Sequence, residues 1–353
     1  MTLRVIIYRL GVIPLLLLLC ILAACSQQDL DQEEQGMVSL KVLASPGTKA
    51  GEGGTATATL PAKETDIFDL SIFIFNSNGD VIGFTSQDFS DGKPTAVVVK
   101  TRKATGCSVY AIANAKTLNN GESPFDGVST LSVFKTKYLS FTDAKAPDNA
   151  NCLLMMGGVS SGFDTSSASS SSPATITLKR LASRIDYTIA VNNDNATGFP
   201  IVVDSYQLRN VPISTLFLQS DFTSPSMPSS MTFADFDKVS TPIPSVAAAT
   251  SAGTYYVYAN NGTSKETYLD IQAHSEVQGA RTKYTVWKSN FKVEMPDKHV
   301  LPNYHYKIDI VINGSVTGKN GGVITKYEAY PYFSGSILKP WQPEETDRNL
   351  DLQ

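Results

Sequence analysis

The residue with the clearest chemistry is Cys25, which ends an apolar segment near the start of the sequence. Arg4 and Arg9 precede a nearly continuous apolar stretch from Leu10 to Leu22, and Ala23-Ala24-Cys25 follows it. This stretch is too short for a membrane-spanning helix, which needs about 20 apolar residues, but it suits a signal peptide. Small residues before a cysteine are typical of a bacterial lipobox, in which the cysteine sulfur is acylated. We therefore predict a lipoprotein signal peptide at 1–24 and lipidation of Cys25, the alternative being a plain secretory signal.

Two cysteines remain in the mature chain, Cys107 and Cys152. Outside the cytoplasm they could form one disulfide, and the alternative is two buried free thiols. Their spacing resembles no zinc motif. Residues 25–36 are acidic and polar, so we expect a disordered tether between the lipid and the folded part.

Catalytic motifs are absent from the sequence. The three histidines, His274, His299 and His305, lack metal-ligand spacing, and there is no nucleophile elbow, P-loop or dinucleotide fingerprint. A dispersed active site stays open as an alternative, because catalytic triads are spatial. The net charge of -4 and the lack of a basic block disfavour nucleic-acid binding. We expect no enzyme, no cofactor and no metal site.

Alternation of apolar and polar residues dominates the rest of the chain and indicates β-strands. In Tyr304–Ile312 the even-numbered residues form an apolar face, and Asp69–Phe75 reads as a strand buried on both faces. A short helix is expected within 129–138. Further strands are predicted at 81–84, 96–100, 108–113, 201–208, 254–259, 267–273 and 281–287.

Many short strands with frequent turns imply an all-β protein, and a mature chain of this length favours two tandem β-sandwich domains. The alternation shifts parity between Lys179 and Ser183, which a bulge or a passage between sheets would explain. We place the N-terminal domain at 37–191 and the C-terminal domain at 192–353, with Asn192-Asn193-Asp194-Asn195 as the link.

Several motifs follow one another along the chain. They are the lipobox, Ile72-Phe73-Ile74-Phe75-Asn76 with Gly79, Tyr110-Ala111-Ile112-Ala113-Asn114-Ala115, Thr177 to Ile185, Tyr255-Tyr256-Val257-Tyr258-Ala259-Asn260 with Thr267 to Ile271, and Pro302-Asn303-Tyr304-His305-Tyr306. Taken in this order, they resemble the fimbrillin superfamily of Bacteroidetes type V pili. The resemblance covers nearly the whole mature chain, although each motif is loose and Ala259 and Pro302 depart from the family pattern.

The resemblance implies two transthyretin-like β-sandwich domains in a lipoprotein of the outer membrane. It also implies that a maturation protease removes an N-terminal segment and that subunits then polymerise by strand exchange. Other fimbrial subunits would be the partners, and the fimbrium would be the final location.

This mechanism can be mapped onto the chain as a hypothesis. Met37–Ala44 reads as a strand with Val38, Leu40 and Val42 on one face, and a polar, glycine-rich loop follows it. Lys49 stands where the family often has an arginine, so the predicted cut lies between Lys49 and Ala50. Removal of the strand would open a groove for a strand of another subunit.

The candidate donor is Ser334–Trp341, with Ile337 and Trp341 on one face. Pro340 weakens this assignment because it cannot donate to a ladder, and an ordinary last strand is the alternative. The chain is thus expected to be a stalk or tip pilin. The alternatives are a basal anchor that stays lipidated, or a surface adhesin that binds glycans or host ligands through exposed aromatics. The available aromatics are Trp287, Trp341, Tyr255, Tyr256 and Tyr258. About half of the residues in an alternating strand face the core, so core packing is the default expectation for them.

Overall fold

The computed structural model describes residues 35–44, 61–92, 94, 96–165, 174–192, 201–244, 247–278, 283–313 and 323–331. The predicted all-β class is confirmed: strands make up most of the described elements, and the helices are short. Those helices are η1 (Ala62–Glu64), α2 (Ala115–Leu118), α3 (Leu131–Thr136), α4 (Ala146–Asn149) and η2 (Pro296–Lys298).

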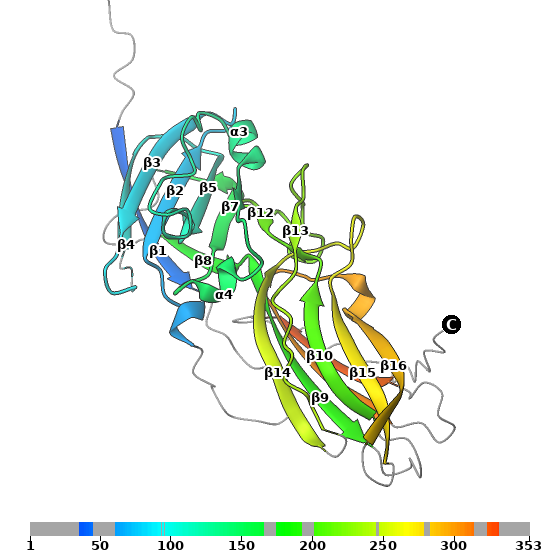
Figure 1. Ribbon diagram of the computed structural model, residues 1–353. Helices are drawn as coiled ribbons and strands as arrows, with labels where there is room; N and C mark the ends of the chain where they lie inside the picture. Colours follow the sequence, from blue (N-terminus) through cyan, green and yellow to red (C-terminus); the bar gives the residue numbers. More distant parts are fainter. Residues whose placement is uncertain are drawn as a thin grey trace, which may run out of the picture.

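The first group of strands forms a closed barrel in the order β1-β4-β3-β2-β5-β7-β8, which we call the N-terminal barrel. Its members are β1 (Gln35–Ala44), β2 (Asp69–Phe75), β3 (Val81–Asp88), β4 (Ala96–Arg102), β5 (Cys107–Ala113), β7 (Met155–Phe163) and β8 (Ala174–Arg180). The barrel occupies one end of the molecule (Figure 1).

Strand β2 is buried along its whole length because each of its faces packs on a different apolar cluster. Leu70, Ile72 and Ile74 point into the barrel. Phe73 and Phe75 point outward, under a layer built from residues that include Phe125 and Phe134. The continuous apolar run of this strand is therefore explained by a core on each side.

The second group of strands forms two sheets that pack on a shared core, and we call it the C-terminal sandwich. One sheet has the order β14-β9-β17-β18 and the other β10-β15-β16. The strands are β9 (Ala182–Asn192), β10 (Ile201–Arg209), β14 (Ala247–Tyr258), β15 (Tyr268–Gln278), β16 (Lys283–Glu294), β17 (Tyr304–Asn313) and β18 (Val323–Pro331).

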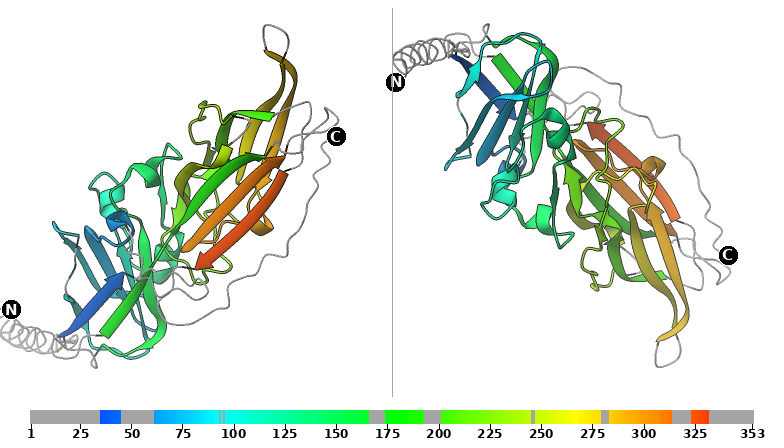
Figure 2. Two further views of the ribbon diagram at one scale, coloured as in Figure 1. Left: turned by 90° about the horizontal axis from the view of Figure 1, so that it is seen from below. Right: turned by 90° about the horizontal axis from the view of Figure 1, so that it is seen from above.

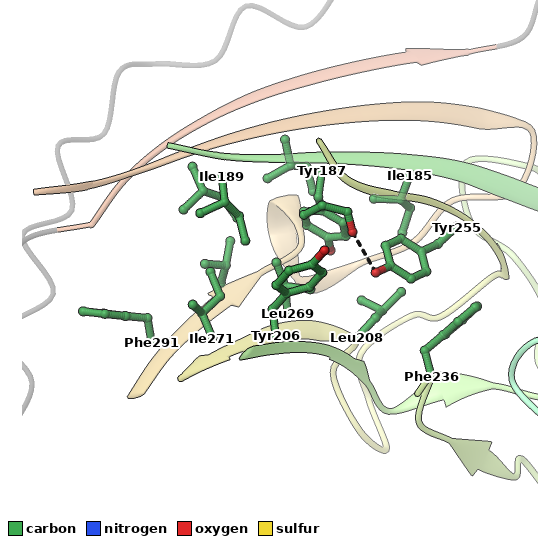
Figure 3. Packing of buried hydrophobic residues seen from close by; sticks show 14 of the residues in the cluster. Ile185, Tyr187, Ile189, Tyr206, Leu208, Phe236, Tyr255, Leu269, Ile271 and Phe291 are labelled. Carbon is green, nitrogen blue, oxygen red and sulfur yellow. Dashed lines mark hydrogen bonds between the residues drawn. The ribbon is translucent and has the colours of Figure 1, made fainter. Parts of the chain in front are cut away.

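The core of the sandwich contains aromatic side chains from both sheets. Tyr187 of β9 and Tyr255 of β14 point into the core from one sheet, and Tyr206 of β10 enters it from the other (Figure 3). The Phe236 ring meets the Tyr255 ring edge-on. The ring centroids of Phe236 and Tyr255 are 4.8 Å apart, a favourable geometry for aromatic pairs.

The chain crosses from barrel to sandwich at Leu181. Strand β8 ends at Arg180, and β9 begins at Ala182 and pairs with β14 and β17 of the sandwich. Of the two explanations for the parity shift, the passage between sheets is the one observed. Residues 182–191, which sequence analysis placed in the first domain, therefore hydrogen-bond into the sandwich, because β9 supplies a central strand of its four-stranded sheet.

Short strands join the two halves directly. Strand β6 (Tyr138–Ser140) from the first half pairs with β12 (Ser214–Leu216) from the second, and β11 (Val211–Pro212) pairs with β13 (Phe233–Ala234) beside it. One apolar cluster contains side chains of both halves, such as Phe134, Phe217 and Tyr258. Figures 1 and 2 show the resulting elongated shape. Among the described residues, no helix is long and apolar enough to cross a membrane.

Candidate functional site

The feature that bears most on function is the position of β1. This strand lies between β4, to which it runs antiparallel, and β8, to which it runs parallel. In the left view of Figure 2 the blue β1 lies beside the green β8. A single N-terminal strand therefore closes the barrel.

Strand β1 is bound by its two neighbours at different ends. Residues 35–41 align with β4, from Gln35 opposite Arg102 to Lys41 opposite Ala96. Residues 40–44 align with β8, from Leu40 opposite Ala174 to Ala44 opposite Leu178. The two ladders share only residues 40 and 41.

The neighbours of β1 have few other ladder partners in the described part of the chain. Residues 174–178 of β8 align with β1 alone, since β7 pairs with β8 only at Lys179 and Arg180. Strand β4 is aligned with β3 at a single position, Gly83 opposite Thr101. Strand β1 thus supplies most of the hydrogen bonding on this side of the barrel.

The two strands that flank β1 contribute buried side chains to the barrel core. Val97, Val99, Ile176 and Leu178 are buried, between 0% and 3% exposed, and belong to one apolar cluster. Val98, between the two buried valines, is exposed on the outer face. The alternation in both strands matches a sheet with one core face and one solvent face.

The predicted site residues can now be placed. Val38, Leu40 and Val42 lie in β1, as the pattern of Met37–Ala44 predicted. Cys25, Lys49, Ala50, Ile337 and Trp341 lie outside the described residues. The processing and donor-strand hypotheses therefore stay predictions.

Cys107 and Cys152 are free and buried in the structure, so the disulfide is not formed. The reason lies in strand β5: Cys107 begins the strand, whereas Cys152 adjoins Leu153, whose carbonyl oxygen accepts a hydrogen bond from Asn114 just past the other end. Seven residues of strand extend about 20 Å, whereas a disulfide needs Cα atoms within about 7 Å. Burial raises the pKa of the Cys152 thiol to about 12, which makes it unreactive.

A buried polar cluster, which sequence reasoning did not identify, lies where η1 meets the sandwich. The Glu64 side chain is fully buried, and its Oε1 accepts hydrogen bonds from the Tyr256 hydroxyl at 2.5 Å and Arg184 Nη1 at 3.2 Å. Arg180 Nε donates to the Glu64 carbonyl oxygen at 2.7 Å. Among the described residues, Glu64 Oε2 has no hydrogen-bond partner. We call Glu64, Arg180, Arg184 and Tyr256 the junction cluster.

Three neighbouring contacts strengthen the junction. Lys63 Nζ donates to the Asp148 carbonyl oxygen at 2.5 Å and lies 4.2 Å from the Tyr256 ring centroid. Burial lowers the pKa of Lys63 despite its acidic neighbours. The Asp148 carboxylate accepts a hydrogen bond from the Tyr256 backbone N–H at 3.0 Å. Residues just after the 45–60 segment are thereby fixed against the sandwich.

The polar chain continues into the sandwich sheet through Asp186. This carboxylate accepts hydrogen bonds from Thr254 at 2.6 Å and Arg184 at 3.0 Å, and it contacts His305 Nε2 at 2.6 Å. Burial favours the neutral acid, but the hydrogen bonds from His305, Thr254 and Arg184 outweigh it and hold the pKa of Asp186 well below its usual range.

Among the described residues, the remaining chemistry-bearing side chains form pairs and no catalytic arrangement. His274 pairs with Asp204 at 2.7 Å on the sheet formed by β10 and β15. In the part of the chain that the structure describes, no group of three His, Cys, Asp or Glu side chains could hold a metal ion. Tyr255, Tyr256 and Tyr258, the tyrosines available to the adhesin alternative, are buried, as core packing predicts.

Comparison with known proteins shows one family match and several structures with the same fold. Residues 37–198 match the family model of the major fimbrial subunit protein (FimA). No curated protein matches the chain.

Several solved structures share the fold at low sequence identity. A proposed cell adhesion protein from Parabacteroides distasonis superposes with a TM-score of 0.59 at 16% identity, covering 85% of this chain and 98% of that one. Fimbrilin from Porphyromonas gingivalis gives a TM-score of 0.54 at 14% identity, with 85% and 98% covered. The C-terminally truncated tip fimbrial protein Mfa3 of the same species gives 0.53 at 12% identity, with 84% and 100% covered.

These findings agree with the sequence motifs. The family match covers the barrel and β9, and the shared fold extends over most of the chain. The predicted resemblance to the fimbrillin superfamily is confirmed over residues 37–198, and beyond them the comparisons show the shared fold alone.

Proposed function

We propose that this protein is a structural subunit of a cell-surface fimbrium that assembles by exchange of its first strand. The observation that carries the proposal is the position of β1, which closes the barrel between β4 and β8 and leads into the segment with the predicted cleavage site. Strand β1 sits at one end of the folded chain, so a single backbone cut would detach it.

The energetic consequence of removing β1 is large. Four buried side chains, on β4 and β8, lie in strands that border the place of β1, and full exposure of all four at about 1.5–3 kcal/mol each would set an upper limit of about 6–12 kcal/mol. The lost ladder bonds would add about 0.5–1.5 kcal/mol net each. A strand from another subunit that alternates apolar and polar residues would restore both contributions. Assembly would then need no external energy source.

The sequence supplies the remaining steps of the proposal. Acylation of Cys25 would hold the precursor at the outer membrane, and cleavage between Lys49 and Ala50 would release the lipid together with β1. Ser334–Trp341 of a neighbouring subunit, with Ile337 and Trp341 facing the core, is our candidate for the replacing strand. A subunit that escapes cleavage would remain lipidated and serve as a basal anchor.

We infer a structural role and not an enzymatic one, because the buried polar residues of the junction cluster hydrogen-bond to one another where elements meet. Adhesion remains compatible with a subunit at the fibre tip. Burial of Tyr255, Tyr256 and Tyr258 leaves these aromatics unable to carry glycan binding, which argues against that form of the adhesin alternative.

Limited proteolysis tests the proposal. A soluble form starting at Ser26 would be treated briefly with a lysine-specific protease, the cut located by mass spectrometry and assembly followed by size-exclusion chromatography. We expect selective cleavage after Lys49 and formation of oligomers. The variant Lys49→Gln is the matched control and should stay uncut and monomeric.

Other outcomes would change the assignment. Cleavage without assembly would point to a tip subunit without a usable donor strand. Resistance of Lys49 while other lysines are cut would contradict the maturation step, and a permanently anchored subunit would then describe the protein better.

A further inference from the structure

The site of β1 consists of two half-sites with different properties. Residues 35–39 align only with β4, and residues 42–44 align only with β8. The β4 half is antiparallel and spans seven aligned pairs, whereas the β8 half is parallel and spans five. Parallel pairing is slightly less stable per residue, so the β8 half holds β1 less firmly.

The β8 half also lies at the end of β1 that cleavage would free. In the intact chain, Ala44 is tethered through residues 45–61 to η1, which the junction cluster fixes. A cut in this segment converts the C-terminal side of β1 into a loose chain end. Strands fray from their free ends, so residues 42–44 should open before residues 35–39.

Complete departure of β1 would leave β8 without a ladder over residues 174–178 in the described part of the chain. The edge of the barrel core next to Ile176 and Leu178 would border the open groove. A stepwise exchange avoids this state, because each new pair on β8 can form as one pair of β1 is released. The β4 ladder meanwhile keeps β1 in place.

We propose that residues 174–178 of β8 are the first docking site for an incoming strand, which displaces β1 from its C-terminal end toward β4. The occupant is an extended segment of another subunit whose apolar residues alternate, as they do in the sequence of β1. This inference rests on the proposed strand exchange and adds the place where it begins.

Disulfide trapping can follow the two half-sites separately. Leu43 aligns with Thr177, and Ser39 aligns with Val98. Thr177→Cys and Val98→Cys would each be made in a form starting at Ser26, with a site-specific protease sequence inserted between residues 49 and 50. Both positions are exposed and outside the core, and native Cys107 and Cys152 are buried.

The probe is a synthetic peptide with the sequence of residues 35–44. It carries Leu43→Cys for the β8 variant and Ser39→Cys for the β4 variant. The peptide cysteine is activated as a mixed disulfide with 2-thiopyridine, so the protein thiolate attacks it, forms the new S–S bond and releases pyridine-2-thione. After cleavage, mass spectrometry would record the rate of mixed-disulfide formation, normalised to the rate with a small disulfide reagent. We expect trapping at Thr177→Cys to begin at least tenfold faster than at Val98→Cys.

Each alternative result has a distinct meaning. Equal rates at both positions would contradict the proposal and indicate that β1 leaves completely before a strand enters. Faster trapping at Val98→Cys would overturn it in favour of entry from the β4 side. If neither cysteine is trapped even after β1 has been removed in denaturant and the protein refolded, strand exchange itself fails, and the proposed function fails with it.

Discussion

The sequence motifs of this chain repeatedly contain asparagine, and the structure gives the reason: the side chains hydrogen-bond to backbone groups at the ends of strands. Asn76, Asn114, Asn260 and Asn303 each follow or precede a strand and hydrogen-bond to the backbone of the adjoining turn or strand. Asn303 Oδ1 accepts from the Arg180 N–H at 3.0 Å and so fixes the crossing between barrel and sandwich. The hydrogen-bond partners of these asparagines are brought next to them by the fold, so the motifs alone do not identify the partners.

Asn114 offers the clearest test at this scale. Its backbone is left-handed, with φ of 67°, and its buried side chain accepts from the Phe68 N–H and donates to the carbonyl oxygens of Asp66 and Leu153. We expect Asn114→Ala to lower the free energy of unfolding by about 2–4 kcal/mol. The control Asn120→Ala, at an exposed position with φ of 57°, should cost about 1 kcal/mol or less. Similar losses in urea titrations of both variants would contradict this account.

The Tyr256 hydroxyl, which donates to the buried Glu64 carboxylate, gives a second test. Tyr256→Phe should lower the free energy of unfolding by about 1–3 kcal/mol at pH 7, whereas Tyr138→Phe, at an exposed tyrosine, should change it by less than about 0.5 kcal/mol. Burial and the Glu64 hydrogen bond raise the pKa of Tyr256.

The raised pKa fixes the sign of the pH dependence. A group whose pKa is higher in the folded than in the unfolded protein contributes its full stabilisation of the fold at any pH below the unfolded pKa, which is about 10 for tyrosine. This contribution to the free energy of unfolding is lost as the pH rises from there toward the folded pKa. The difference between wild type and Tyr256→Phe should therefore be constant from pH 7 to about 10 and shrink above it. Denaturant titrations at several pH values measure this difference in unfolding free energy. A difference that grows above pH 10 would contradict the hydrogen bond from the neutral Tyr256 hydroxyl to Glu64 as its cause.

At the scale of elements, alternation predicted the central strands well. Tyr304–Ile312 and Asp69–Phe75 correspond to β17 and β2 with errors of at most one residue. Sequence analysis did not identify β18, although in Val323–Pro331 the residues Val323, Tyr327 and Ala329 alternate with Lys326 and Glu328. It could not indicate the pairing of β6 with β12 either, since these three-residue strands are defined only by contact between the two halves.

The close approach of β7 to β8 makes a prediction about the element next to β1. A Cβ atom on Gly157 would lie 2.3 Å from the Thr177 carbonyl oxygen, so only glycine fits without displacing β8. Gly157→Ala should cost about 1–3 kcal/mol in unfolding free energy and speed hydrogen exchange in residues 174–178. Ser161→Ala, exposed on the same strand, is the control. Unchanged exchange in β8 would refute the claim that this contact positions the strand.

At the scale of the whole molecule, the buried junction, together with the β6–β12 pairing and the shared apolar cluster, fixes how the two halves are oriented. Glu64 lies 116 and 120 residues from Arg180 and Arg184 and 192 residues from Tyr256 in the sequence, so no local pattern could have predicted the cluster. Buried ion pairs often contribute more to a unique arrangement than to stability. A fixed angle between barrel and sandwich would suit a subunit that must repeat along a fibre.

The central claim is that the place of β1 is filled by a strand of a neighbouring subunit in the assembled fibre. The most direct measurement is a structure of that fibre at a resolution that identifies side chains between β4 and β8. Our account predicts a strand continuous with the adjacent subunit, aligned with residues 96–102 and 174–178, and no trace of residues 35–44. Finding residues 35–44 of the same chain still in that position would contradict it.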